Sequence, residues 1–366
     1  MAQIPNIENL TIAAEEVRDL REVIARAIYQ DPNWLSLHNV VDGISKKTQI
    51  LLDDSSGNAG WKATGCAAVQ SGGMSIKLAE KYWEPVTIED MIDYCQADLN
   101  VNFKPLVIRN AKDKFGDLSD QEAINVFISA SVERFIKESA ERLAWLADTE
   151  ADNLSEGSYI KDTVNPKFYT PLDGIWKQIF DAKTAGTLTA FTNVAANEQA
   201  TKALQLSTMD DDAAFAIVKA VYDAAPDPLK LDPAAYIWVT PAMYNQYKNY
   251  LAANTLSGGG IAMITIEGIP TPTYMGVPLK TSLLVGQKIR TDMEVSDGAS
   301  PEVLTYNLPH RAVMATPDLL PAATTNTEDI EALESFFVQL ERKSYIRFDY
   351  ALDVKVVRPD MISVAY

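Results

Sequence analysis

Few side chains in this sequence have the types and spacing that catalysis or metal binding requires. Two histidines, His38 and His310, occur in 366 residues, and neither belongs to a nucleophile-elbow or His-Glu-x-x-His pattern. The two cysteines, Cys66 and Cys95, form no Cys-x-x-Cys pair and have no histidine nearby. These counts exclude a disulfide framework and argue against a zinc site. We expect both histidines to be structural and both cysteines to act as small buried hydrophobic residues.

The carboxylates are numerous, but none is spaced as a catalytic pair or a cation loop. Asp210, Asp211 and Asp212 precede a predicted helix, where N-capping and the helix dipole explain them. A second acidic group lacks the spacing and central glycine of an EF-hand, so we interpret it as a solvated turn. Its members are Asp148, Glu150, Asp152 and Glu156.

The glycine run Gly258–Gly260 does not have the features of a phosphate-binding loop. No Lys-Ser or Lys-Thr follows it, and it leads into a predicted strand rather than a helix. We interpret it as a loop tip or hinge. With no catalytic, cofactor or metal constellation in view, the sequence predicts a protein that is not an enzyme.

Charge and hydropathy narrow the class of protein further. The net charge is −18, with 47% hydrophobic and 22% charged residues, as in a soluble globular protein. An acidic surface repels nucleic acid, although simple solubility explains the charge equally well. The sequence has neither an apolar run of membrane-spanning length nor a secretory signal, so we expect folding in a bacterial or viral cytoplasmic setting.

The first third of the chain predicts a helix, a hairpin and a strand. Residues 12–30 form an amphipathic pattern that Asp31-Pro32 ends. Residues 44–81 predict a long hairpin with a flexible tip, poor in apolar residues and rich in glycine. Because a lone hairpin is marginally stable in water, we expect it to need a surface elsewhere. Residues 82–99 alternate as a strand does.

The rest of the chain predicts an α+β fold. A capping box at Ser119 and Glu122 opens a long helix over residues 120–147, in which Glu133 and Lys137 have the spacing of a helical ion pair. Further helices are predicted at 174–183, 210–226 and 241–254, and strands at 235–240, 261–268, 303–308, 312–316 and within 341–366. The aromatic residues of this part lack interleaved Lys and Arg, so we expect them in the core: Trp238, Tyr244, Tyr247 and Tyr250.

The order of these elements resembles that of the major capsid proteins of tailed phages, which have the Johnson fold. Three stretches resemble the axial strand and helix, the strand that follows, and the closing strands: AAYIWVTPAMYNQYKNYLAAN, GIPTPTYMGVPLKTSLLV and ERKSYIRFDYALDVKVVRPDMISVAY. A fourth is similar to the peripheral-domain entry in capsid proteins of phages infecting Bacteroidetes, YWEPVTIEDMIDYCQADL. The resemblance covers the chain from about residue 44 onward and rests on the ordered set rather than on one motif.

The resemblance implies a division of the chain into four parts. These are an N-terminal arm (1–43), an extended loop formed by the hairpin (44–81), a peripheral domain (82–169 and 326–366) with the spine helix at about 120–147, and an axial domain (170–325). It also implies self-assembly into hexamers and pentamers of an icosahedral or prolate head that encloses double-stranded DNA. The expected partners are further copies, a portal, and scaffolding or decoration proteins; the DNA is enclosed without sequence-specific binding, and no membrane is involved.

Charge within the chain suggests where copies meet. The hairpin 44–81 has five lysines and three carboxylates, a net charge of +2, so the remainder of the chain carries −20. A basic hairpin on an acidic body suits a loop that lies on the next copy, although a solvated hairpin with ordinary lysines would show the same count. We predict these inter-subunit contact residues: Lys46, Lys47, Trp61, Lys62, Lys77, Glu133, Lys137 and Glu141.

Two further expectations concern assembly, and two alternatives stay open. The predicted arm helix begins close to residue 1, so we expect no N-terminal maturation cleavage and a separate scaffolding protein or none. Lys62 has no identifiable partner for a covalent cross-link, so we expect none. The expected location is the virion, after assembly in the host cytoplasm. The alternatives are an encapsulin-type nanocompartment shell and a soluble α+β enzyme with an unseen site.

Overall fold

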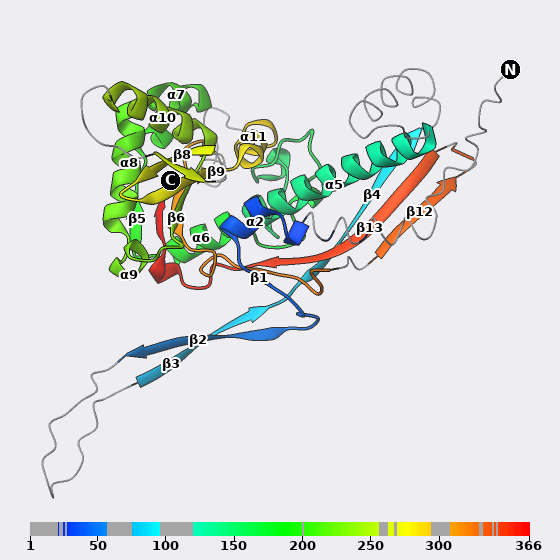
Figure 1. Cartoon of the computed structure of the whole chain (residues 1–366), viewed down its shortest axis with the longest axis horizontal. Helices are drawn as coiled ribbons and strands as arrows, with labels where there is room; N and C mark the ends of the chain where they lie inside the picture. Colours follow the sequence, from blue (N-terminus) through cyan, green and yellow to red (C-terminus); the bar gives the residue numbers. More distant parts are fainter. Residues whose placement is uncertain are drawn as a thin grey trace, which may run out of the picture.

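A computed structural model describes most of the chain and contains three parts (Figure 1). One part surrounds a seven-stranded sheet, one consists of a long sheet under a long helix, and one is a hairpin that projects from the body. The described residues are 28–56, 75–95, 120–199, 201–255, 263–266, 269–293, 308–328, 332–338, 340–341 and 343–366, together with residues 21 and 25.

The described helices and strands have the following bounds. The helices are α2 (Pro32–Leu37), α5 (Asp120–Leu146), α6 (Ile175–Thr184), α7 (Lys202–Thr208), α8 (Asp211–Ala224), α9 (Asp227–Lys230), α10 (Pro241–Thr255) and α11 (Leu283–Thr291). The strands are β1 (Val40–Val41), β2 (Thr48–Ser56), β3 (Ser75–Trp83), β4 (Val86–Cys95), β5 (Ala190–Thr192), β6 (Tyr236–Val239), β7 (Met263–Ile266), β8 (Ile269–Tyr274), β9 (Val277–Thr281), β10 (Ala312–Ala315), β11 (Ala322–Ala323), β12 (Ala332–Val338), β13 (Lys343–Val354) and β14 (Ser363–Ala365).

The long sheet is built on β13, which pairs antiparallel with β4 along one edge and with β12 and then β11 along the other. Helix α5 covers one face of this sheet (Figure 1). Alternate residues of β13 point toward the helix: the ring of Phe348 meets that of Phe135 edge-on at 6.5 Å, and Tyr350 donates to Ser139 at 3.3 Å. The period of two in β13 and the apolar stripe of α5 therefore explain their packing.

The seven-stranded sheet has the order β5-β14-β10-β6-β9-β8-β7, and β6 lies at its centre with all four residues buried. Helices α8 and α10 pack on this part of the molecule. Trp238 of β6 stacks on Trp145 at the end of α5, with ring centroids 4.4 Å apart, and lies 5.8 Å from Trp176 of α6. One tryptophan cluster therefore joins the seven-stranded sheet to the long helix.

Most of the predicted elements are confirmed. The long helix ends at Leu146, one residue before the predicted end, and the helices predicted at 174–183, 210–226 and 241–254 are α6, α8 and α10. Predicted strands correspond to β4, β6, β7, β10, β13 and β14. The expected core aromatics Trp238 and Tyr247 are fully buried, and Tyr244 and Tyr250 pack partly buried against the core.

The predicted end of the first helix at Asp31-Pro32 is confirmed, because Ile28 and Tyr29 are helical whereas Gln30 and Asp31 are not. A new helix, α2, begins there, because Asp31 accepts a hydrogen bond from the backbone N–H of Asn33 at 3.1 Å and Pro32 occupies the first turn. Of the predicted helix at 12–30, the structure describes Arg21, Ala25, Ile28 and Tyr29 as helical, and the remainder lies outside the described residues.

Several of the described elements were not predicted, among them the strands β1, β5, β11 and β12 and the short helices α7, α9 and α11. Helix α11 begins within the last residues of the stretch GIPTPTYMGVPLKTSLLV, which the sequence predicted as a strand. Its local signal is Ser282, whose hydroxyl accepts from the N–H of Val285 at 3.2 Å. Thr201 caps α7 in the same way, through Leu204. A single capping residue before a short apolar run is a weak signal, which explains the omission.

The projecting hairpin confirms the prediction for residues 44–81 at its base. Strands β2 and β3 pair antiparallel from Thr48 opposite Trp83 to Ser56 opposite Ser75, as a two-stranded sheet of their own. Figure 1 shows this sheet extending away from the body. The tip (57–74), Cys66, the glycine run Gly258–Gly260 and nearly all of the strand predicted at 303–308 lie outside the described residues.

Candidate functional site

Both histidines are buried structural residues, as the sequence predicted. The ring of His38 lies 4.6 Å from that of Trp34 and 5.5 Å from that of Trp145, and its Nδ1 donates to the carbonyl of Leu320 at 2.7 Å. Burial lowers the pKa of His38 to about 4, so the ring is neutral at physiological pH. The Nε2 of His310 donates to the carbonyl of Gln205 at 2.9 Å.

The aspartate run before α8 caps that helix, as predicted. Asp210 accepts from the backbone N–H of Ala213 at 2.6 Å, and Asp211 and Asp212 lie in the first turn. Within the described residues, no group of three or more His, Cys, Asp and Glu side chains could hold a metal ion. These carboxylates therefore stabilise the start of α8.

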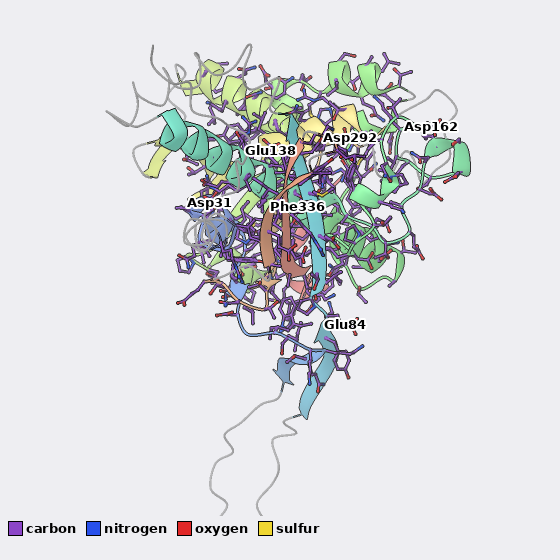
Figure 2. All side chains as sticks on the ribbon, turned by 90° about the vertical axis from the view of Figure 1, so that its right-hand side faces the viewer. Asp31, Glu84, Glu138, Asp162, Asp292 and Phe336 are labelled. Carbon is purple, nitrogen blue, oxygen red and sulfur yellow. The ribbon has the colours of Figure 1, made fainter. Side chains whose placement is uncertain are left out.

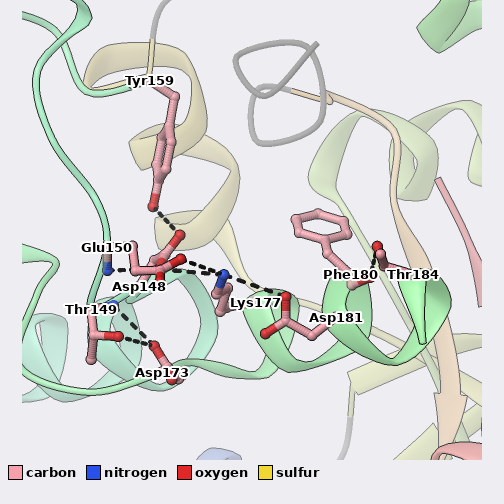
Figure 3. A network of polar contacts seen from close by, with 9 residues as sticks. All are labelled: Asp148, Thr149, Glu150, Tyr159, Asp173, Lys177, Phe180, Asp181 and Thr184. Atoms are coloured by element: carbon pink, nitrogen blue, oxygen red, sulfur yellow. Dashed lines mark hydrogen bonds and ion pairs between the residues drawn. The ribbon is translucent and has the colours of Figure 1, made fainter. Parts of the chain in front are cut away.

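The second acidic group is more than a solvated turn, which corrects the prediction. Asp148 is only 3% exposed and receives a hydrogen bond from the hydroxyl of Tyr159 at 3.4 Å. The Nζ of Lys177 lies 3.3 Å from Glu150, 3.3 Å from Asp181 and 3.9 Å from Asp148 (Figure 3). Lys177 of α6 thus lies close to Asp148 and Glu150, which follow α5, and to Asp181 of its own helix. Its positive charge compensates the buried carboxylate of Asp148.

The predicted contact residues on the hairpin have different surroundings. Lys46 is exposed. Lys47 forms an ion pair with Glu84 and lies 4.7 Å from the ring centre of Tyr82. Lys77 belongs to β3, opposite Asp54 of β2. Trp61 and Lys62 lie outside the described residues.

The predicted contact residues on α5 make contacts within the chain. Glu133 and Lys137 form the ion pair that their spacing predicted, at 3.3 Å, and Lys137 also lies 3.2 Å from Asp31. Glu141 accepts a hydrogen bond from the hydroxyl of Ser282, and burial raises the pKa of its carboxyl group. These three side chains join α5 to α2 and α11; contacts with another copy stay a prediction.

A hollow of about 930 Å³ lies between α2, α5 and α11. Lys280 lines it and donates from Nζ to the carbonyl of Ser36 at 2.6 Å, and burial lowers its pKa to about 8. The other charged side chains of the lining include Asp31, Lys137 and Glu141. Lys280 joins β9 to α2, and the other three groups make contacts between α5 and the starts of α2 and α11, so each of the four is engaged in a contact within the fold.

The face of the long sheet that points away from α5, here called the outer sheet face, carries an aromatic and ionic surface. Phe336 stacks on Tyr345 with ring centroids 5.5 Å apart, and Met91 is 51% exposed. Arg347 lies opposite Met91 in the register and 2.9 Å from Glu89. Exposed apolar side chains beside ion pairs are typical of surfaces that meet another protein.

The contacts at the root of the hairpin join residues that are far apart in the sequence and were not predicted. Asp353 of β13 accepts from the backbone N–H of Glu84 at 2.9 Å, and Lys355 lies 3.1 Å from the same carboxyl group. Lys81 of β3 donates to the carbonyl of Val356 at 2.5 Å. Glu84 and Asp353 are 269 residues apart in the chain and Lys81 and Val356 are 275 apart, so no local pattern connects them.

No protein-family model matches the sequence, and no curated protein matches it either. Solved structures do match. A chain in the satellite phage P4 procapsid structure, which includes the size determination protein, aligns with a TM-score of 0.51 and 9% identity over 95% of this chain and 97% of that one. A chain of the cyanophage P-SCSP1u capsid has a TM-score of 0.48 and 12% identity over 90% and 86%.

A chain of the SrpI encapsulin complex from Synechococcus elongatus PCC 7942 has a TM-score of 0.45 and 11% identity over 92% and 87% of the two chains. At identities near 10%, a match reports the fold and leaves function to be argued from the site. No helix of the described residues is long and apolar enough to cross a membrane. With its long helix, long sheet and projecting hairpin, this α+β chain has the Johnson fold of tailed-phage capsid proteins.

Proposed function

We propose that the chain is the major capsid protein of a tailed phage and assembles into hexamers and pentamers that enclose double-stranded DNA. The observation that carries this proposal is the hairpin β2–β3, a separate two-stranded sheet that projects from a body with the Johnson fold. A two-stranded sheet is marginally stable in water by itself. A second copy of the chain would supply the surface on which it rests.

The outer sheet face is the proposed receiving surface. It has an aromatic pair, Phe336 and Tyr345. The ion pairs Lys343–Asp93 and Arg347–Glu89 lie on the same face, and α5 covers the opposite one. A projection and a receiving surface at different places on one chain make a heterologous contact, which closes into rings when the rotation between copies allows it. Rings of five and six copies are the proposed capsomers.

We assign the parts of the fold as the sequence resemblance implied. Residues 1–43 would be the arm, 44–81 the extended loop, 82–169 with 326–366 the peripheral domain and 170–325 the axial domain. The packing of α5 on β13 supports residues 82–169 and 326–366 as one peripheral unit. The seven-stranded sheet with α8 and α10 would form the axial domain.

The proposed partners follow from charge and from the shell itself. A net charge of −18 suits a shell that encloses DNA without binding it tightly. A portal, and scaffolding or decoration proteins, would bind the assembled shell, and the virion would be its location. The proposal includes no catalytic activity, because the polar side chains described above are engaged in structural contacts.

Electron microscopy of the purified chain tests the proposal. We expect closed shells from the full chain, and a folded protein without stable shells when residues 54–73 are replaced by a short Gly-Ser turn. The matched control exchanges Lys219 and Asp223, an exposed ion pair of α8, for each other. Normal shells from the shortened hairpin would contradict its role. A full chain that stays monomeric would contradict the capsid proposal.

The contents of the particles separate the proposal from its nearest alternative. We expect nuclease-protected double-stranded DNA in particles isolated from infected or induced cells. An enzyme cargo without DNA would favour the nanocompartment shell instead. A monomer or small oligomer with catalytic turnover would favour the enzyme alternative.

A further inference from the structure

The direction of the hairpin is set at a very short connection. Strand β3 ends at Trp83 and β4 begins at Val86, so only Glu84 and Pro85 separate the projecting hairpin from the long sheet. Figure 2 shows Glu84 at the point where the hairpin leaves the body. Whatever fixes the backbone at Glu84 therefore fixes the direction in which the hairpin points.

Backbone pairing ends at this position. The ladder between β13 and β4 reaches from Lys343 opposite Cys95 to Leu352 opposite Val86 and goes no further. The next residue toward the hairpin, Pro85, has no N–H to donate. Beyond Leu352, β13 pairs through Asp353 and Val354 with β11, on its other edge.

The side chain of Asp353 continues the connection where the ladder stops. It accepts from the N–H of Glu84 at 2.9 Å through one carboxylate oxygen, while Lys355 lies 3.1 Å from the other. Asp353 is only 3% exposed, and burial raises the pKa of its carboxyl group while Lys355 and the Glu84 N–H oppose that rise. A buried carboxylate with both oxygens engaged holds its donor in a narrow range of positions.

Two lysines make polar contacts at the root of the hairpin. Lys81, in β3, reaches back to the carbonyl of Val356 at 2.5 Å, just beyond β13. Lys47, immediately before β2, forms an ion pair with Glu84. Lys81 therefore attaches β3 to the segment that follows β13, and Lys47 joins the start of the hairpin to Glu84, the residue whose N–H donates to Asp353.

We propose that Asp353 is a positioning residue that fixes the angle between the hairpin and the long sheet. Its carboxylate replaces the missing backbone pairing at Pro85, and Lys81 provides the second attachment. The fixed angle is a property of the single chain. Its consequence for shell geometry rests on the function proposed above, because a hairpin that lies on the next copy determines how neighbouring copies are inclined.

Hydrogen exchange and spin-label distances test the fixed angle. Asp353→Ala removes the acceptor, and we expect the Glu84 amide to exchange about tenfold faster, as the loss of one hydrogen bond predicts. Asp353→Asn keeps an oxygen that can accept from Glu84, and we expect it to restore slow exchange. Asp227→Ala, which removes a carboxylate that is 91% exposed in α9, is the matched control.

The distance between two spin labels, one on the hairpin and one on the long sheet, reports the angle between them. Labels at Gln49→Cys on β2 and Leu340→Cys at the end of the long sheet, in a chain with Cys66 and Cys95 replaced by serine, should give a narrow distance distribution. We expect a broad one in Asp353→Ala, a narrow one in Asp353→Asn, and melting temperatures close to that of the parent chain in both. A narrow, unshifted distribution in Asp353→Ala would overturn the proposal.

Electron microscopy of the same variants connects the angle to assembly. With wild-type shells as the reference, Asp353→Ala should yield open or irregular shells and Asp353→Asn regular ones. If the wild-type chain forms no shells, the capsid proposal fails while the label distances still decide the role of Asp353. If Asp353→Ala assembles normally with an unchanged distance, the role of Asp353 fails and the capsid proposal stands.

Discussion

The tryptophan cluster and the root of the hairpin hold the chain together by different means. At the cluster, Trp145, Trp176 and Trp238 are fully buried and in ring contact, and each comes from a different element. At the root, Asp353 and Lys81 make polar contacts with backbone groups. Apolar burial is strong and non-directional, whereas hydrogen bonds are weaker and directional.

This difference suggests a division of tasks within the molecule. The cluster joins α5, α6 and the seven-stranded sheet and should decide whether the chain folds. The root should decide where the hairpin points in a chain that is already folded. A substitution in the first region is therefore expected to change stability, and one in the second to change geometry.

The largest expected effect comes from emptying the cluster. Trp238→Ala removes a fully buried ring that stacks on Trp145, and we expect a loss of about 3–5 kcal/mol in the free energy of unfolding. Chemical denaturation of the purified variant measures it. Leu231→Ala, at a position that is 83% exposed, is the control and should stay within about 0.5 kcal/mol of wild type. A denaturation midpoint of Trp238→Ala equal to that of wild type would contradict the stabilising role of the tryptophan cluster.

Acid should weaken the core through His38. Its pKa is about 4 in the folded chain against 6.5 ordinarily, so between these values the unfolded chain binds the proton more tightly. Stability therefore falls as the pH drops from 6.5 toward 4, by about 3 kcal/mol in all. His38→Asn keeps a donor for the carbonyl of Leu320 but cannot be protonated, and it should lack this loss. Parallel stability curves for the two proteins would contradict the assignment.

The raised pKa values of Glu141 and Asp353 act in the opposite direction, because those groups bind protons more tightly in the folded chain. They are present in both proteins, so the difference between wild type and His38→Asn isolates the histidine. Unfolding by denaturant at several pH values between 4 and 7 provides the curves.

The smallest expected effect lies in the turn between β8 and β9. Met275 has φ of 48°, the only positive φ of a non-glycine residue within the described part of the chain, and Gly276 follows with φ of 87°. Met275 is 73% exposed, so its side chain contributes little packing. Met275→Asn suits this turn and should raise stability by about 0.5–1 kcal/mol. Met275→Val should lower it; thermal unfolding that shows the reverse order would exclude backbone strain as the cause.

Local patterns made much of the fold predictable. The capping box at Ser119 and Glu122 predicted the start of the long helix, its apolar stripe predicted its end to within one residue, and Asp210 predicted the start of α8. The hairpin strands followed from their alternation and from the turn residues between them. In each case the interacting groups are a few residues apart, so the sequence order itself places them together.

The surroundings of individual side chains were less predictable. Asp148 belongs to a turn by its sequence, yet it is buried beside Lys177 of α6. Glu141 accepts from Ser282 before α11, a contact that its position on the helix did not predict. Helical periodicity gives the face on which a residue lies but not the element that covers that face.

The sequence by itself determined the elements, their order and the lack of a recognisable catalytic pattern, because these depend on neighbours within a few residues. The tertiary structure decided the direction of the hairpin. That direction depends on Asp353 meeting Glu84 across 269 residues of chain, at a place where Pro85 ends the backbone ladder. A contact of this kind exists only after β4 and β13 have paired, so no reading of either segment alone contains it.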